Sequence, residues 1–359
     1  MRVVDLFAGL GGFSAGALDA GAQVILGVDH DPVPLKLWSA NVTGGMAVLA
    51  TLGKEELEID LPPPSPSLHV HASSPCTDLS IARGRTASTD EVDEGVRMLS
   101  WCLDLVLKRG DHSWSLENVS TPKTRAVLTE YASNFPGRVA FASLDAADFG
   151  AAQSRIRLIA GPPKLIKLLQ EMPSARRVSV REAFASQGLA VPAPYFKNQT
   201  KSRDGTPCRR SVEEQAFTVC ASHALTWVEH DGRTVKVMSA QDSAVLMGFK
   251  ASWRLAKGSR HAQRMVGNAL CVQMARAIMQ AAISIETATP MPAAEPAACT
   301  ATRLGQSAIG KQKHGDYRRL KKRIRTIEAL VRNLQGSTTQ HLLDEPRSRA
   351  TGVSSPVLT

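Results

Sequence analysis

The chain has 359 residues, of which 43% are hydrophobic, enough for one large domain or two smaller ones with a sizeable core. No apolar run approaches the roughly 18 residues of a membrane span, and the N-terminus lacks the charged head and long apolar stretch of a signal peptide. The six cysteines form no C-x-x-C pair and no histidine cluster lies beside them, so we expect no metal site and no disulfide framework.

The positive charge of the chain is unevenly distributed. The formal net charge is +10, and the segment 310–335 alone contains nine Lys/Arg and two Asp/Glu. Such a balance favours a polyanionic partner but does not specify a fold.

Predicted strands and helices alternate through the first half of the chain. Buried β-prone runs and amphipathic spacings follow one another from the N-terminus. In chain order we expect a strand at 2–7, a helix at 13–20, a strand at 23–29, a helix at 32–41, a strand at 68–73, a helix at 90–108, a strand at 113–116, a helix at 122–134, and strands at 139–144 and 157–160. This alternation implies a parallel sheet in an α/β domain.

The second half of the chain is less regular. Residues 173–260 mix Gly, Pro and polar turns with short β-prone runs, and a regular helix is expected at 268–285. Residues 286–309 have the low complexity of a linker, and 336–359 are expected to be disordered. Residues 310–335 form a basic amphipathic helix with a heptad seam, for which coiled-coil pairing, nucleic-acid contact and a merely solvated helix all remain open.

A glycine-rich turn follows the first predicted strand. Gly9 and Gly11 precede a predicted helix, where glycine lets a ligand approach the free N–H groups of the helix end. Asp29 ends the next strand, where a carboxylate can bind a ribose diol or serve only as a helix cap. The turn reads Asp5-Leu6-Phe7-Ala8-Gly9-Leu10-Gly11-Gly12 rather than G-x-G-x-x-G, and its acid suits a cationic sulfonium better than a pyrophosphate.

Polar residues also lie at the ends of three later predicted strands. Cys76 comes after the strand at 68–73, and Glu117 ends the strand that begins at Ser113. Alternation places Gln153, Arg155 and Arg157 on one face, and two arginines there are more easily explained by an anionic or polar ligand than by a packed interior. Open α/β sheets place active sites at the carboxyl ends of their strands, so these groups could share one crevice.

Five segments in this order resemble the DNA (cytosine-5) methyltransferase family. They are Asp5-Leu6-Phe7-Ala8-Gly9-x-Gly11-Gly12, Pro75-Cys76, Glu117-Asn118-Val119, Gln153-x-Arg155-x-Arg157 and Gly267-Asn268-Ala269. The resemblance spans residues 1 to about 284 and implies a Rossmann-like, S-adenosylmethionine-dependent methyltransferase sheet with helices on both faces. It also implies a small, irregular, β-containing target recognition domain at 173–260, with a discontinuous catalytic domain formed by 1–172 and 261–285.

The resemblance further implies the chemistry of the site. Cys76 is expected to attack C6 of a flipped-out cytosine, Glu117 to protonate N3, and Arg155 and Arg157 to hold the base. Addition at C6 is needed because C5 is a poor nucleophile, and a covalent step divides a hard reaction into easier ones. For the cofactor S-adenosyl-L-methionine, the resemblance implies that Phe7 stacks on adenine, Asp29 holds the ribose, Gly9 and Gly11 admit the methionine part, and Asn268 closes the pocket.

These expectations describe an enzyme that methylates cytosine in DNA, of the kind found in restriction-modification systems. Cytosine-5 methylation of RNA, a non-catalytic nucleic-acid-binding regulator with the same fold, and a nicotinamide oxidoreductase are the alternatives. We expect DNA as the partner, no membrane and no metal, and a cytoplasmic or nucleoid-associated location, or a nuclear one in a eukaryote.

The chain departs from the family pattern near several of these motifs. Thr77 and Leu79 replace the usual Gln and Phe after the cysteine, and only Asp60 is a weak candidate for the acid that reads the adenine amine. In the expected recognition domain, Arg203, Arg209 and Arg210 could contact phosphate or base edges, or be solvated surface charges.

Overall fold

A computed structural model describes residues 1–53, 59–75, 89–201 and 207–287 of the chain. Cys76, the predicted helix at 310–335 and the predicted tail at 336–359 lie outside these residues. The predicted linker at 286–309 also lies outside them, apart from its first two residues, which belong to the last helix.

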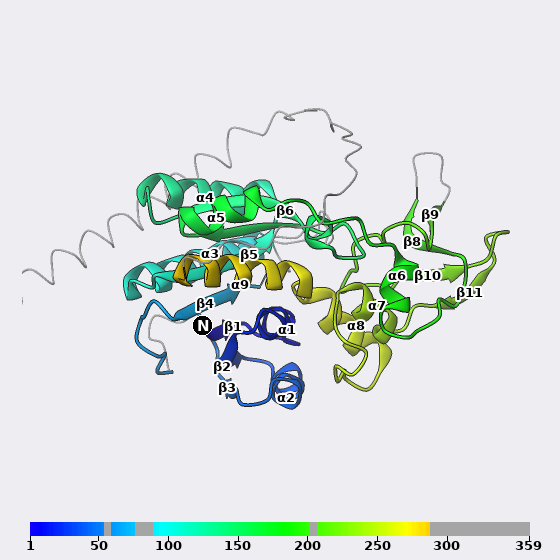
Figure 1. The fold of residues 1–359 in the computed structure, drawn as a ribbon, viewed down its shortest axis with the longest axis horizontal. Helices are drawn as coiled ribbons and strands as arrows, with labels where there is room; N and C mark the ends of the chain where they lie inside the picture. Colours follow the sequence, from blue (N-terminus) through cyan, green and yellow to red (C-terminus); the bar gives the residue numbers. More distant parts are fainter. Residues whose placement is uncertain (54–58, 76–88, 202–206, 288–359) are drawn as a thin grey trace, which may run out of the picture. The chain divides into compact units, whose positions relative to one another are not determined.

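A seven-stranded sheet forms the centre of the fold, with strand order β3-β2-β1-β4-β5-β7-β6 (Figure 1). The strands are β1 (Arg2–Leu6), β2 (Gln23–Asp29), β3 (Met46–Leu49), β4 (Leu68–Ser73), β5 (Ser113–Val119), β6 (Ala140–Asp145) and β7 (Ile156–Gly161). Neighbouring strands from β3 to β5 pair in parallel, whereas β7 is antiparallel to both β5 and β6. The expected parallel sheet is thus correct apart from β7, whose reversal brings its first residues to the edge where β4 and β5 end.

Helices cover both faces of this sheet, as predicted (Figure 1). One core contains buried residues of α1 (Gly12–Asp19), α2 (Pro32–Asn41), α5 (Pro163–Glu171) and α9 (Val272–Thr287), and the other contains residues of α3 (Thr89–Arg109) and α4 (Pro122–Asn134). Successive residues of β1 divide between them, since Val3 belongs to the first core and Val4 to the second. Because successive side chains of a strand point to opposite faces, a strand that is buried on both faces is apolar at successive positions.

A smaller antiparallel sheet follows in the chain, with order β11-β10-β8-β9. It comprises β8 (Tyr195–Lys201), β9 (Pro207–Ser211), β10 (Thr226–Val228) and β11 (Thr234–Val237), accompanied by α6 (Val180–Ala185), α7 (Ala240–Leu246) and α8 (Ser259–Asn268). Outside these strands, Ala216 forms an isolated β-bridge with Gln153. Residues Met1–Cys299 form one compact unit, and the domain boundaries at 172 and 260 stay predictions.

The helix expected at 268–285 begins later than predicted. Helix α8 ends at Asn268, and α9 starts only at Val272. Gly267 lies one residue before the end of α8, and a Cβ there would lie 2.3 Å from the amide nitrogen of Ala221.

A buried ladder of imidazole and hydroxyl groups joins β4 to β5. His69 bonds Ser113 and Ser115, and His71 bonds Ser115 and Ser73, all at 2.8–2.9 Å. Burial lowers the pKa of His69 to about 3 and that of His71 well below its usual value, so both rings are neutral at physiological pH. Each ring nitrogen therefore has a partner, and the ladder fixes the register that sets Ser73 opposite Glu117.

Candidate active site

The glycine turn between β1 and α1 has a strained backbone. Phe7 has φ +58°, an unusual value for a residue with a side chain, and Gly9 and Gly11 have φ +52° and +89°. The amide of Gly11 donates to the Ala8 carbonyl over 2.8 Å, which closes the turn just before α1 begins at Gly12. Strain of this kind persists where the surrounding structure over-determines it, as at ligand sites.

Asp29, at the carboxyl end of β2, ties the turn to the neighbouring strand. Its Oδ2 accepts a hydrogen bond from the Gly9 amide at 2.8 Å, and its Oδ1 accepts one from the Asp31 amide at 2.9 Å. The helix-capping role is filled by Asp31, whose side chain accepts from the Val33 amide at the start of α2. Asp29 is therefore an acid held in place beside the turn, with lone pairs remaining for further hydrogen bonds.

The glycines of the turn differ in what lies beside them. A Cβ on Gly9 would meet only the Phe7 carbonyl oxygen, 3.9 Å away, so the space there is open to a ligand. A Cβ on Gly11 would lie 2.9 Å from the Trp38 ring and 3.2 Å from the Trp253 ring. A Cβ on Gly12 would lie 2.3 Å from the Leu270 carbonyl oxygen, so Gly11 and Gly12 are also required by packing.

Asp5, the acid of the turn sequence, is buried beneath the turn. Its carboxyl accepts a 2.5 Å hydrogen bond from Ser14, whose hydroxyl accepts one from the Trp38 indole. Burial raises the pKa of Asp5 to about 7. The acid that would face a sulfonium is therefore better assigned to Asp29 than to Asp5, which corrects the interpretation of the Asp5-Leu6-Phe7 sequence.

Glu117 and Arg157 form an ion pair at the edge where β4 and β5 end. The Arg157 Nε lies 2.9 Å from Oε1 of Glu117, and the two side chains are 12% and 9% exposed. The antiparallel register of β5 and β7 sets Val119 opposite Arg157, so the two charged residues are diagonal neighbours on one face. The structure thus brings these two predicted site residues together.

Arg155 contacts a different set of groups. Its guanidinium is 2% exposed and donates to the carbonyls of Val219, Gly267 and Ala269 over 2.8–3.1 Å. The premise that a buried arginine here needs an anionic ligand is wrong, because backbone carbonyls supply its acceptors. Gln153 acts similarly, with its amide bonded to the Leu246 carbonyl and the Val219 amide. The expected contact of Arg155 with a base stays a prediction.

The segment leading from β4 toward Cys76 is anchored to β5. The Asn118 side chain donates to the hydroxyl of Ser74 at 2.9 Å and to its carbonyl at 3.3 Å. Cys76 itself lies outside the described residues, and the described chain stops one residue before it, at Pro75. The segment therefore leaves the sheet beside the strand end that holds Glu117.

The remaining predicted residues have separate positions. Phe7 is half-buried and meets the Trp101 ring edge-on, with centroids 6.3 Å apart. Asn268 is the last residue of α8 and is exposed. Arg209 lies over the Tyr195 ring and donates to the His230 carbonyl, and Arg210 lies over the Phe217 ring, whereas Arg203 lies outside the described residues.

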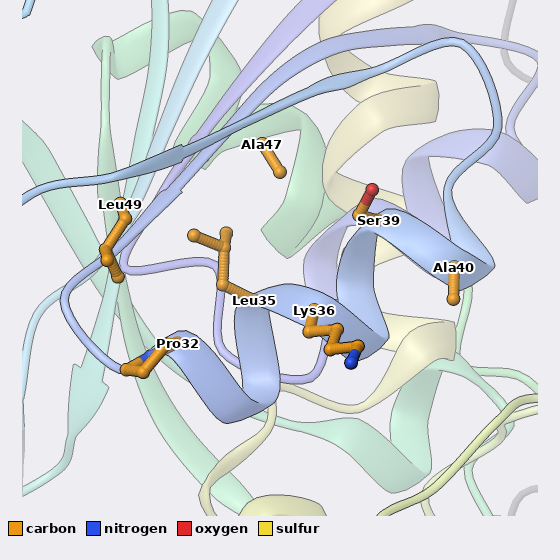
Figure 2. A pocket seen from close by; sticks show the side chains of 7 residues that line it. All are labelled: Pro32, Leu35, Lys36, Ser39, Ala40, Ala47 and Leu49. Carbon is orange, nitrogen blue, oxygen red and sulfur yellow. The ribbon is translucent and has the colours of Figure 1, made fainter.

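A hollow of about 430 Å³ opens between α2 and the edge strand β3 (Figure 2). Its lining is mainly apolar and includes Leu35, Ala47 and Leu49, with Lys36 and Ser39 as polar members. None of the predicted site residues lines it, so we do not assign it to the candidate active site.

The comparisons with known proteins agree with this arrangement. Residues 1–161, which run from β1 to the end of β7, match the C-5 cytosine-specific DNA methylase family. Type II methyltransferase M.HgiDI from Herpetosiphon aurantiacus is 23% identical over 298 residues, covering 77% of this chain and 92% of that protein. Type II methyltransferase M1.HphI from Haemophilus parahaemolyticus is 29% identical over 175 residues, covering 44% of this chain and 45% of that protein. The first 161 residues of this chain are therefore similar to the C-5 cytosine-specific DNA methylases.

Solved structures of methyltransferases share the fold of this chain. A DNA modification methyltransferase encoded within an E. coli prophage superposes with a TM-score of 0.55 at 16% identity, covering 80% of this chain and all of that one. The S. pombe Dnmt2 methyltransferase superposes with a TM-score of 0.51 at 13% identity, covering 80% and 99%. The family segment contains the turn, Asp29, Cys76, Glu117, Arg155 and Arg157, whereas Asn268 lies beyond it.

Two features are absent from the described residues. No helix in them has the length and apolar character needed to cross a membrane. The same residues contain no group of three or more His, Cys, Asp or Glu side chains arranged to hold a metal ion.

Proposed function

We propose that this chain transfers a methyl group from S-adenosylmethionine to carbon 5 of cytosine in DNA, with Cys76 as the nucleophile. The observation that carries the proposal is the Glu117–Arg157 pair, 2.9 Å apart, beside the strand that leads into Cys76. A carboxyl and a guanidinium at one sheet edge, next to a thiol-bearing segment, match the groups that addition to a cytosine ring requires.

The residues of the glycine turn fit the cofactor. Open space above Gly9, a positioned Asp29 carboxylate and the half-buried Phe7 ring provide an approach to the backbone, a hydrogen-bond acceptor and an aromatic face. In this proposal Phe7 holds the adenine, Asp29 the ribose, and Gly9 and Gly11 the methionine part, with Asn268 closing the pocket. When bound, S-adenosylmethionine supplies an electrophilic methyl group on a cationic sulfur.

The chain's own residues prepare the base for methylation. Cys76, as a thiolate, adds to C6 of a cytosine extruded from the duplex, because C5 becomes nucleophilic only after this addition. Glu117 binds and protonates N3, which neutralises the charge that addition places on the ring. Arg157, held against Glu117, fixes the orientation of its carboxyl and contributes a cation that favours thiolate over thiol. Once C5 has accepted the methyl group, its proton passes to solvent, the C5–C6 double bond re-forms, and the C6–S bond breaks to release Cys76 as a thiolate.

The test uses the full-length protein with tritiated S-adenosylmethionine and one of three nucleic acids, which are duplex DNA, single-stranded DNA or tRNA. We expect label on duplex DNA with the wild type and with Cys208→Ser, a half-buried cysteine of β9 that serves as the matched control. We expect Cys76→Ser to lose transfer. Transfer to tRNA alone would overturn the DNA substrate, and full transfer by Cys76→Ser would overturn the nucleophile.

A second substrate examines the covalent step separately. Duplex DNA containing 5-fluorocytosine should form a stable adduct with the wild type, because fluorine at C5 cannot leave as a proton does. The adduct is expected to survive denaturing electrophoresis, and to be absent with Cys76→Ser. An equal yield of adduct with both proteins would place the attacking group elsewhere.

A further inference from the structure

The exposed face of α8 is basic and has no acidic neighbours in the sequence. Residues 243–285 contain six Lys/Arg and no Asp/Glu. Within α8, Arg260, His261, Arg264 and Asn268 are exposed, whereas Ala262, Met265 and Val266 are buried. The spacing of 260, 264 and 268 places these residues along one side of the helix. We call Arg260, His261 and Arg264 the α8 stripe.

The stripe is not used to balance charge within the described part of the chain. Arg260 and Arg264 form no ion pair or hydrogen bond with another described residue, whereas some exposed arginines elsewhere do, such as Arg176 with Glu182 and Arg181 with Glu213. A stripe of unneutralised cations is costly through self-repulsion unless an anion lies against it, which favours a polyanionic partner over a solvated face.

The position of the stripe relates it to the candidate active site. The Arg155 guanidinium donates to the carbonyls of Gly267 and Ala269 at the end of α8, and Arg157 two residues later pairs with Glu117. The opposite face of α8 is held by Gln263, which donates to the Cys220 carbonyl. The stripe therefore starts beside the residues anchored to the site and runs away from them along the helix.

The length of the stripe agrees with contact to two phosphates. Arg260 and Arg264 lie four positions apart, or about 6 Å of helix at 1.5 Å per residue. One strand of duplex DNA advances about 3.4 Å per phosphate, so about two phosphates pass over that distance. From these observations we infer that the α8 stripe binds the sugar-phosphate backbone of duplex DNA beside the extruded base. The inference rests on the proposed function.

The test measures how salt weakens binding to a duplex DNA oligonucleotide, by fluorescence anisotropy from about 50 to 200 mM NaCl. Arg260→Gln/Arg264→Gln is compared with the wild type and with Lys164→Gln/Lys167→Gln, which removes two exposed charges from α5. Each lost phosphate contact lowers the slope of log K against log salt by about 0.9, so we expect a decrease of about 1.8 for the α8 variant. The α5 variant should keep the wild-type slope. Arg260→Lys/Arg264→Lys retains both charges and should have the wild-type slope. A decrease in slope in the Gln variant but not in the Lys variant therefore reflects the lost charges and not misfolding.

The outcomes separate this inference from the proposed function. If the wild type methylates DNA and the α8 variant has the wild-type slope, the inferred DNA contact of the α8 stripe is wrong and the proposed activity stands. If the α8 variant shows the expected decrease in slope but the wild type transfers no methyl group, the DNA contact stands and the proposed activity is wrong. Failure of the wild type to bind duplex DNA, or stronger binding to RNA of equal length, would overturn the stripe.

Discussion

Replacing Arg155 by methionine should destabilise the protein strongly. The substitution keeps an unbranched apolar stem but removes three hydrogen bonds, to the carbonyls of Val219, Gly267 and Ala269. Hydrogen bonds from a charged group contribute about 1.5–3 kcal/mol each, and their loss here leaves buried carbonyls without a donor. Because contributions within one network are not additive, we expect the free energy of unfolding to fall by about 3–5 kcal/mol.

The measurement is urea unfolding followed by tryptophan fluorescence. Arg209→Met is the matched control, because Arg209 also donates to a backbone carbonyl, that of His230, but is exposed. Water can replace that bond, so we expect a change of about 0.5 kcal/mol or less. A decrease in the free energy of unfolding of less than about 1 kcal/mol for Arg155→Met would refute the reasoning, because it is smaller than the contribution of a single hydrogen bond from a charged group.

Three further predictions concern the glycine turn and the histidine ladder. Gly12→Ala should weaken S-adenosylmethionine binding, measured by calorimetry, because its Cβ would lie 2.3 Å from the Leu270 carbonyl oxygen and must displace the turn. Gly21→Ala is the control, because a Cβ there meets nothing within 4 Å. Equal affinities of the two variants would contradict the prediction. The free energy of unfolding should fall as the pH drops below about 6.5, because unfolded histidines take up protons that His69 and His71 cannot accept when folded. Asp5, whose pKa is raised to about 7, makes the free energy of unfolding rise as the pH drops, which is the opposite effect. The contribution of the two histidines is therefore measured as the difference in pH dependence between the wild type and His69→Gln/His71→Gln. Identical pH dependences in the two proteins would contradict the prediction. The Ser115 hydroxyl has one proton and bonds both rings, so it donates to one and accepts from the other, and nitrogen NMR should find the same tautomer on both histidines.

Much of the sheet could be predicted from local sequence. The strands at 23–29 and 68–73 and the helices at 32–41 and 122–134 have the predicted bounds, because their apolar periodicity and the Pro residues at the helix starts are local signals. β3 was missed, because its four residues follow two glycines and are too few to establish a period. The reversal of β7 is a property of strand pairing that the sequence pattern does not contain.

The candidate site was predictable only in part, for a similar reason. Alternation placed Arg157 on one face of its strand, but its pairing with Glu117 depends on the reversal of β7, which brings the start of that strand to the edge where β5 ends. The contacts of Arg155 depend on carbonyls more than 60 residues away along the chain, so spacing alone suggested a ligand instead. Asp5 belongs to a network with Ser14 and Trp38 that forms only when α1 and α2 pack together.

The contact of α9 with α1 has a consequence for biosynthesis. Gly16 lies so close to α9 that a Cβ there would be 2.5 Å from the Ala275 side chain, and Gly12 is equally close to Leu270. The ribosome must therefore deliver nearly all residues up to Thr287 before the first helix of the nascent polypeptide gains its permanent neighbour. Until then the side of that helix that contains Gly12 and Gly16 has no such cover, and premature termination before residue 270 should yield a product that aggregates or engages chaperones.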